Sequence, residues 1–215
     1  MGIQVSKIHT LPIKMYIAKV NEDTKRLSLF PTLVYNINIP EVVDDIRNIL
    51  PTVKWRMPDD NRSASESFCL LDEYQQLKDV FTDKVNAAVS ELHYSVPLKL
   101  TTSWLFRLKP GAKHFRHRHT NSFWSASFYF EEGEKEALNV SKTASDISIP
   151  FNTGDLGIIP YGRISFPAEC GKLLLFPSHL DHWVDRNTFD KTRHVLAMNF
   201  MPDGKTGDLD STFTY

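Results

Sequence analysis

The order of the hydrophobic patterns along the chain limits the fold most strongly, because helical periodicity comes first and period-two alternation follows it. Residues 74–94 place apolar side chains three and four positions apart, which predicts an amphipathic helix. A shorter helix is expected to begin at Pro40 and to end at Pro51. From Leu98 to Leu108 apolar side chains share one parity, which is typical of a strand. Helices followed by strands predict an α+β domain, mainly β, whose helices cover one face of a β-sandwich or barrel.

Shorter strands are expected at 33–39, 123–130, 164–166, 173–176 and 195–200. Residues 51–70 and 131–162 are the longest irregular stretches, and we expect them to form the rim of a pocket. A chain of 215 residues that is 41% apolar fits one domain. Its expected parts are an N-terminal arm (1–28), a strand with supporting helices (29–97), a β core (98–200) and a C-terminal tail (201–215).

Charge and composition argue against several classes of partner. The net charge is −1, so there is no electrostatic reason to expect a nucleic acid. No apolar run approaches the ~20 residues that a membrane helix needs. The two cysteines, Cys69 and Cys170, do not make a disulfide framework, which favours a reducing compartment such as the cytoplasm. The oligomeric state is not indicated.

The histidines are the strongest candidates for a site. His114, His117 and His119 fall within six residues, and His182 follows a later predicted strand. In an extended chain, side chains two residues apart point the same way, so His117 and His119 are expected on one face and His114 on the other. Two such residues and a distant third histidine can form a three-point metal site, and neutral imidazole suits iron, zinc, copper or nickel. The alternative is a histidine-rich surface loop without a metal.

The parity of the flanking residues supports an interior site. The face of His117 and His119 continues through side chains that are largely small and polar, whereas the other face is bulky and apolar. Arg193 and Asn199 share one face of the last strand. An arginine that points into a barrel needs an anion, because a buried unpaired charge is costly. The alternative for Arg193 is a surface position on a frayed strand. The small or polar face comprises Asn121, Phe123, Ser125, Ser127 and Tyr129.

Four segments, in order, resemble a family of 2-oxoglutarate/Fe(II) oxygenases that is similar to prolyl 4-hydroxylases and frequent in marine bacteria and their phages. They span roughly residues 29–200. The four are Leu29–Thr32, the family's usual opening; His117–Ser122 with Ser125–Tyr129, which resemble H-x-H-x-N-S…S-G-x-x-Y; Gly171–Val184, which resembles G-x-L-L-L-F-P-S-x-L-x-H-x-V; and Arg193–Asn199, which resembles the closing R-x5-N strand.

This resemblance implies a double-stranded β-helix, the cupin-like jelly roll, and a dioxygenase. Iron(II) would be held by His117, His119 and His182, which are therefore the expected catalytic residues. 2-Oxoglutarate would chelate the metal and pair with Arg193, helped by Ser127, Tyr129 or Asn199. The family's reaction releases succinate and CO₂ and oxidises a C–H bond, so the expected activity is hydroxylation of a small molecule or peptide, with a prolyl or other amino-acid side chain as the best guess.

The chain departs from the family at one ligand. The usual set is two histidines and a carboxylate, but the position of the carboxylate holds His119. His119 is either a ligand or a neighbour of a metal-bound water, and a hidden acid ligand would have to come from elsewhere in the chain, such as Glu131 or Asp155. Two other functions stay open: a non-catalytic jelly-roll binding module, and a three-histidine cupin metalloenzyme that does not use 2-oxoglutarate.

Overall fold

The computed structural model describes residues 16–19, 25–28, 32–133, 137–142 and 162–215. The chain divides into two compact units, Met1–Leu33 and Val34–Tyr215. In the first unit, strands β1 (Tyr16–Lys19) and β2 (Lys25–Ser28) pair antiparallel. The expected division of the chain into arm, helical part, core and tail stays a prediction.

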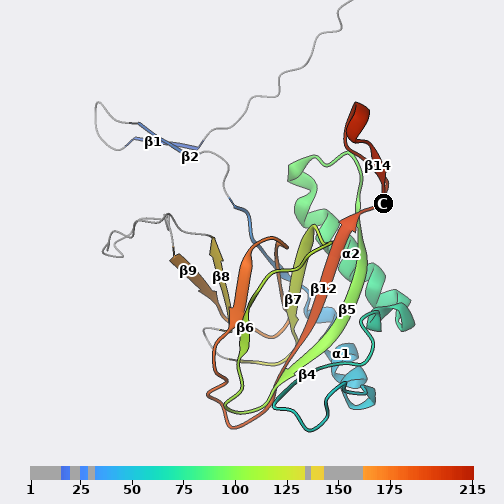
Figure 1. Cartoon of the computed structure of the whole chain (residues 1–215), viewed down its shortest axis with the longest axis vertical. Helices are drawn as coiled ribbons and strands as arrows, with labels where there is room; N and C mark the ends of the chain where they lie inside the picture. The colour runs from blue at the N-terminus through green and yellow to red at the C-terminus, as the bar shows by residue number, and fades with distance from the viewer. Residues whose placement is uncertain (1–15, 20–24, 29–31, 134–136, 143–161) are drawn as a thin grey trace, which may run out of the picture. The chain divides into compact units, whose positions relative to one another are not determined.

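The second unit is built on two antiparallel sheets (Figure 1). In the six-stranded sheet the spatial order is β3 (Tyr35–Asn38), β10 (Lys172–Pro177), β7 (Trp124–Tyr129), β12 (Arg193–Pro202), β5 (Leu98–Leu108) and β4 (Arg62–Ala64). In the four-stranded sheet it is β6 (His114–His117), β11 (Asp181–Val184), β8 (Leu138–Lys142) and β9 (Gly162–Phe166). The chain passes repeatedly from one sheet to the other, which confirms the predicted mainly β, α+β jelly roll.

The two predicted helices precede the β core. They are α1 (Val43–Ile49), which follows the 3₁₀ turn Pro40–Val42 and leads into Leu50–Thr52, and α2 (Gln75–Val89), which follows Leu70–Glu73 and leads into Ser90–Leu92. Both lie behind the six-stranded sheet in Figure 1. Phe81 of α2 packs edge-on against Phe128 of β7, with ring centroids 5.1 Å apart. The predicted cover of helices on one sheet is therefore confirmed.

The C-terminal part adds β13 (Lys205–Thr206), the 3₁₀ turn Leu209–Ser211 and β14 (Phe213–Thr214).

Strand register separates the helix-facing side of the sheet from its inner side. Phe128 of β7 is paired with Leu196 of β12, so both side chains lie on the face that α2 covers. Ser125 is paired with Asn199 on the opposite face. This alternation follows from the period of two in a strand. It confirms the faces expected for β7 and β12.

One inference from parity is wrong. His117 ends β6 in the four-stranded sheet, whereas β7 begins at Trp124 in the six-stranded sheet. Between them Asn121 takes a left-handed conformation with φ 52°, and the chain crosses from one sheet to the other. His119 therefore lies on this crossing, not beside His117 on one strand. The irregular stretches also contain short strands, since β4 lies within 51–70 and β8 within 131–162.

Candidate metal centre

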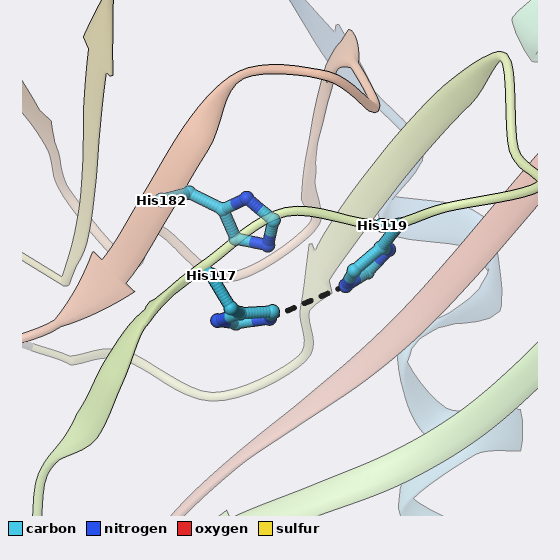
Figure 2. A group of neighbouring side chains, drawn as sticks. All are labelled: His117, His119 and His182. Carbon is cyan, nitrogen blue, oxygen red and sulfur yellow. Dashed lines mark hydrogen bonds between the residues drawn. The ribbon is translucent and has the colours of Figure 1, made fainter. Parts of the chain in front are cut away.

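Three histidine side chains converge between the sheets. His117 comes from the end of β6, His119 from the crossing to β7, and His182 from β11. One potential ligand atom of each lies within 4.8 Å of the others. Figure 2 shows the three rings turned toward one another. His182 is paired with His117 in strand register, which brings residues far apart in sequence together.

Backbone carbonyls hold the Nδ1 atoms of two of these rings. His117 Nδ1 lies 2.8 Å from the carbonyl oxygen of Phe115, and His182 Nδ1 lies 3.0 Å from that of Leu180. A carbonyl only accepts hydrogen bonds, so each Nδ1 carries the proton. Each Nε2 then keeps its lone pair, which is the state that a metal ligand needs.

His119 is held by side chains instead. Its Nδ1 lies 2.7 Å from Oδ1 of Asn199 and 3.0 Å from the hydroxyl of Ser125. The amide of Asn199 is oriented by donating from Nδ2 to Thr102, 3.0 Å away, while Ser125 donates to its Oδ1 at 2.8 Å. His119 Nδ1 therefore also donates its proton, and its backbone N–H is fixed by the carbonyl of Ser178. Its Nε2 is left for a metal.

Two of these Nε2 atoms lie close together, and neither carries a proton that it could donate to the other. Nε2 of His117 and Nε2 of His119 are 3.3 Å apart, the contact drawn as a dashed line in Figure 2. With both protons on Nδ1, this contact joins two lone pairs and is repulsive. A cation between them relieves the repulsion. The donor set therefore fits a metal that accepts neutral imidazole, such as iron(II).

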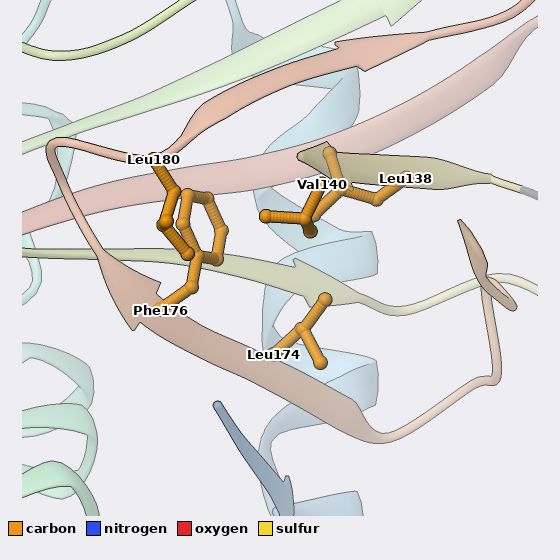
Figure 3. Packing of buried hydrophobic residues seen from close by; sticks show 5 residues of the cluster. All are labelled: Leu138, Val140, Leu174, Phe176 and Leu180. Carbon is orange, nitrogen blue, oxygen red and sulfur yellow. The ribbon is translucent and has the colours of Figure 1, made fainter. Parts of the chain in front are cut away.

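Burial favours the neutral form of two of these rings, His182 and His119. The pKa of His182 is lowered to about 3, chiefly by loss of solvation on burial. Burial also lowers the pKa of His119. His182 packs against Phe176, with ring centroids 4.9 Å apart, and Phe176 belongs to the apolar cluster shown in Figure 3. That cluster excludes water from one side of the site, and its buried members are Leu138, Val140, Leu174, Phe176 and Leu180.

No carboxylate of the described residues joins the three histidines. Asp181 binds Arg116, with its Oδ2 2.8 Å from Nη2. Glu131, considered as a hidden ligand, lies 3.2 Å from Nδ1 of His194. Asp155, the other candidate, falls outside the described residues. Among the described residues, the third position of the cluster belongs to His119.

The residues expected to bind the cosubstrate lie in two places. Arg193, Ser127 and Tyr129 line one small cavity, and the buried phenol of Tyr129 has its pKa raised to about 12, mainly by burial. Asn199 lies on the same strand face but contacts His119 instead. The cavity measures about 30 Å³, which is room for about one water. A dicarboxylate as long as 2-oxoglutarate therefore enters only if side chains move.

The expectation that His114 points away from His117 is wrong. A bulge shifts the register between β6 and β11, so that the four residues His114–His117 of β6 lie opposite the three residues His182–Val184 of β11. The extra residue of a bulge interrupts the alternation of side chains along a strand. The rings of His114 and His117 therefore come to lie 4.5 Å apart. His114 is still not part of the ligand group. Its pKa is lowered to about 4, mainly by burial.

Several contacts of the site were not expected from the sequence. Ser125, Ser178 and Ser122 form a chain of hydroxyl hydrogen bonds, with 2.8 Å at each step, that leads away from His119. Trp104 of β5 lies beside His119, with ring centroids 5.6 Å apart. For Ser125 the sequence did contain a signal, because its parity matches that of the other residues expected on the interior face. Ser178 and Trp104 carry no such signal, because their positions depend on how strands from distant parts of the chain align.

A family model described as "putative 2OG-Fe(II) oxygenase" matches residues 102–199. The resemblance found in the sequence is therefore confirmed over the strands that carry the three histidines and Arg193. A search of curated proteins finds no significant match.

Solved structures with the same fold are numerous. HygX from Streptomyces hygroscopicus, solved with nickel, 2-oxoglutarate and hygromycin B, has a TM-score of 0.58 and 15% identity over 80% of this chain and 83% of its own. The epimerase SnoN, solved with Fe³⁺, α-ketoglutarate and nogalamycin RO, has a TM-score of 0.59 and 12% identity over 80% of each chain. A Pseudomonas putida prolyl-4-hydroxylase has a TM-score of 0.52 and 13% identity over 80% of this chain and 93% of its own. At these identities the likeness establishes the fold.

No described helix is both long and apolar enough to cross a membrane.

Proposed function

We propose that this chain, which resembles the 2OG-Fe(II) oxygenases through the strands that carry its histidines, is an iron(II)- and 2-oxoglutarate-dependent dioxygenase. His117, His119 and His182 hold the iron through Nε2. Arg193 pairs with the far carboxylate of 2-oxoglutarate, and Ser127 and Tyr129 line the same end of the site. Asn199 acts on His119 rather than on the cosubstrate.

One observation carries this proposal: three imidazoles, one buried and two partly buried, converge on a shared point, and Nε2 of His117 lies 3.3 Å from Nε2 of His119. The Nδ1 atoms are already engaged with acceptors. The resemblance to the oxygenase family over residues 102–199 supports iron as the metal and 2-oxoglutarate as the cosubstrate.

The protein's part in the reaction is to bind, orient and exclude water. When bound, iron supplies oxygen activation coupled to the decarboxylation of 2-oxoglutarate to succinate and CO₂. The apolar cluster behind His182 keeps water from one side of the metal. The guanidinium of Arg193 is suited to a carboxylate because its planar donors match both oxygens. Tyr129 stays protonated at neutral pH, so it can donate a hydrogen bond to an anion.

The oxidised substrate is proposed to be a small molecule or a peptide, and the outcome a hydroxylation. Structural neighbours include a prolyl-4-hydroxylase, an epimerase and a carbocyclase, so the fold serves more than one oxidation. Both cysteines are free, which agrees with a reducing cytoplasm as the proposed location.

The test is succinate formation by protein reconstituted anaerobically with Fe(II) and then given oxygen and 2-oxoglutarate. We expect succinate from the wild type and none from His117→Ala or His182→Ala, which should also lose stoichiometric iron while staying folded. A protein that binds iron but consumes no 2-oxoglutarate would contradict the proposal. Full iron in both variants would contradict the ligand assignment.

A three-histidine metalloenzyme without 2-oxoglutarate is the second candidate. The neutral ligand set and the small cavity beside Arg193 favour it. It does not explain why Arg193 lies beside that cavity. Anaerobic addition of 2-oxoglutarate to the iron-loaded protein separates the two, because chelation produces a metal-to-ligand charge-transfer band only if 2-oxoglutarate binds the iron.

A further inference from the structure

His114 is a buried histidine that the proposed iron site does not use. Its Nδ1 is buried and has no hydrogen-bond partner among the described residues. A buried polar atom without a partner costs free energy, and in a native structure it needs an explanation. An imidazole ring always carries at least one N–H, so His114 has a hydrogen that it can donate.

The position of His114 gives that explanation. Its ring centroid lies 4.5 Å from that of Phe106, which lines the cavity beside Arg193, and 4.5 Å from that of His117. Val184, its partner in strand register, lines the same cavity. His114 thus neighbours both His117 and two residues that line the cavity of Arg193. A molecule that joined a metal at His117 to Arg193 would therefore run near it.

The small volume of the cavity implies that side chains near it move when a larger molecule binds. About 30 Å³ is too little for a dicarboxylate, so at least one neighbouring side chain moves when the cosubstrate binds. His114 is at the end of β6 where the bulge interrupts regular pairing.

We propose that His114 is a binding residue for the cosubstrate, whose Nδ1 makes a hydrogen bond with an oxygen of bound 2-oxoglutarate. This inference rests on the proposed function. The alternative is a purely structural role, in which the ring only fills space between Phe106 and His117.

Two substitutions separate these roles. His114→Phe keeps a ring and removes Nδ1, whereas His114→Asn loses the ring and keeps a polar group near the Nδ1 position. The measurement is anaerobic titration of 2-oxoglutarate into full-length, Fe(II)-loaded protein, followed by the charge-transfer band. Fe(II) binding without 2-oxoglutarate is measured in parallel.

If Nδ1 binds the cosubstrate, His114→Phe should weaken 2-oxoglutarate binding about 10- to 100-fold, the usual effect of losing a hydrogen bond to a charged group. His114→Asn should bind it within a few-fold of wild type, and Fe(II) binding should not change in either variant. Wild-type binding by the Phe variant with weaker binding by the Asn variant would overturn the proposal in favour of packing. Loss of Fe(II) binding in His114→Phe would also overturn it, because the ring would then be supporting His117. A wild type that gives no band at all would instead contradict the proposed function.

Discussion

At the scale of single residues, the chemistry of the site depends on which imidazole nitrogen is free. For His117 and His182 the backbone makes this choice, since a carbonyl two residues earlier holds each Nδ1. For His119 the choice depends on Asn199, whose Oδ1 accepts from Nδ1. Partners of this kind set the tautomer and orientation of a ligand. His119 should therefore be the ligand most sensitive to substitution of its neighbours.

Asn199→Leu should lower iron affinity about 10- to 100-fold, the usual effect of losing a partner that orients a ligand. The physical reason is that the Nδ1–H of His119 loses its strongest acceptor. Isothermal titration with Fe(II) under anaerobic conditions measures this. Thr102→Val is the matched control, because it removes the acceptor of Asn199 Nδ2 and leaves the bond to His119. Equal losses of iron affinity in both variants would show that the effect comes from local packing and not from the hydrogen bond between Asn199 and His119.

His119→Asp should hold iron at least as well as the wild type. It restores the usual set of two histidines and one carboxylate, and the anionic ligand offsets the charge of the metal. We expect the amide of Asn199 to turn so that Nδ2 donates to the new carboxylate. Competition with a chelator gives the relative affinities, with His119→Asn as a neutral control of similar size. Weaker binding by the Asp variant than by the Asn variant would indicate that His119 is a neighbour of the metal and not a ligand.

At the scale of elements, β12 joins the two halves of the proposed site. Arg193 and Asn199 lie on the same inner face of this strand, six positions apart, one beside the small cavity and the other on His119. Leu196 and Met198, two of the helix-facing residues between them, are fully buried, which fixes the register of the strand. β12 therefore sets the distance between the residue proposed to bind the cosubstrate and the residue that holds a proposed metal ligand.

Arg193→Ala should weaken 2-oxoglutarate binding at least ~30-fold, because a buried carboxylate loses its charged partner. Iron binding should stay within a few-fold of the wild type, since Arg193 is outside the histidine group. Titration of the charge-transfer band gives the first quantity and metal analysis the second. An unchanged band titration in this variant would show that another residue anchors the cosubstrate.

The elements also explain what the sequence could and could not indicate. Residue type and order were enough to predict the helices, the long strands and the grouping of the three histidines. Parity misplaced His114 because of the bulge opposite β11, and it placed His119 on a strand that ends at His117. The resemblance implied a place for Asn199 at the cosubstrate, whereas its hydrogen bond to His119 depends on the register with Ser125 and on where the crossing brings His119. Bulges, crossings and register arise from long-range packing, which a local pattern does not contain.

At the scale of the whole molecule, the buried histidines couple stability to pH. Burial lowers the pKa of His182 to about 3 and that of His114 to about 4 from 6.5. Below pH 6.5 the unfolded chain binds protons that the folded chain does not, so stability falls as the pH is lowered toward these folded values. Each such group contributes a slope of about 1.4 kcal/mol per pH unit within its window.

Metal-free wild type should therefore lose stability steadily between pH 6 and pH 4, and His114→Phe should lose less because one titrating group is gone. Urea unfolding across this range, with a chelator present, measures the free energy at each pH. Glu91→Gln, an exposed substitution far along the chain from the histidines, controls for changes in surface charge. A slope that is the same in His114→Phe and in the wild type would show that His114 is not protected from protonation by burial.

The central claim is that three histidines hold iron for 2-oxoglutarate. The most direct measurement is an anaerobic crystal structure of the full chain with Fe(II) and 2-oxoglutarate. We expect the metal at bonding distance from Nε2 of His117, His119 and His182, with the 2-oxo acid on the metal and the far carboxylate at Arg193. A protein carboxylate oxygen on the metal in place of His119, or 2-oxoglutarate bound away from the histidines, would contradict the account.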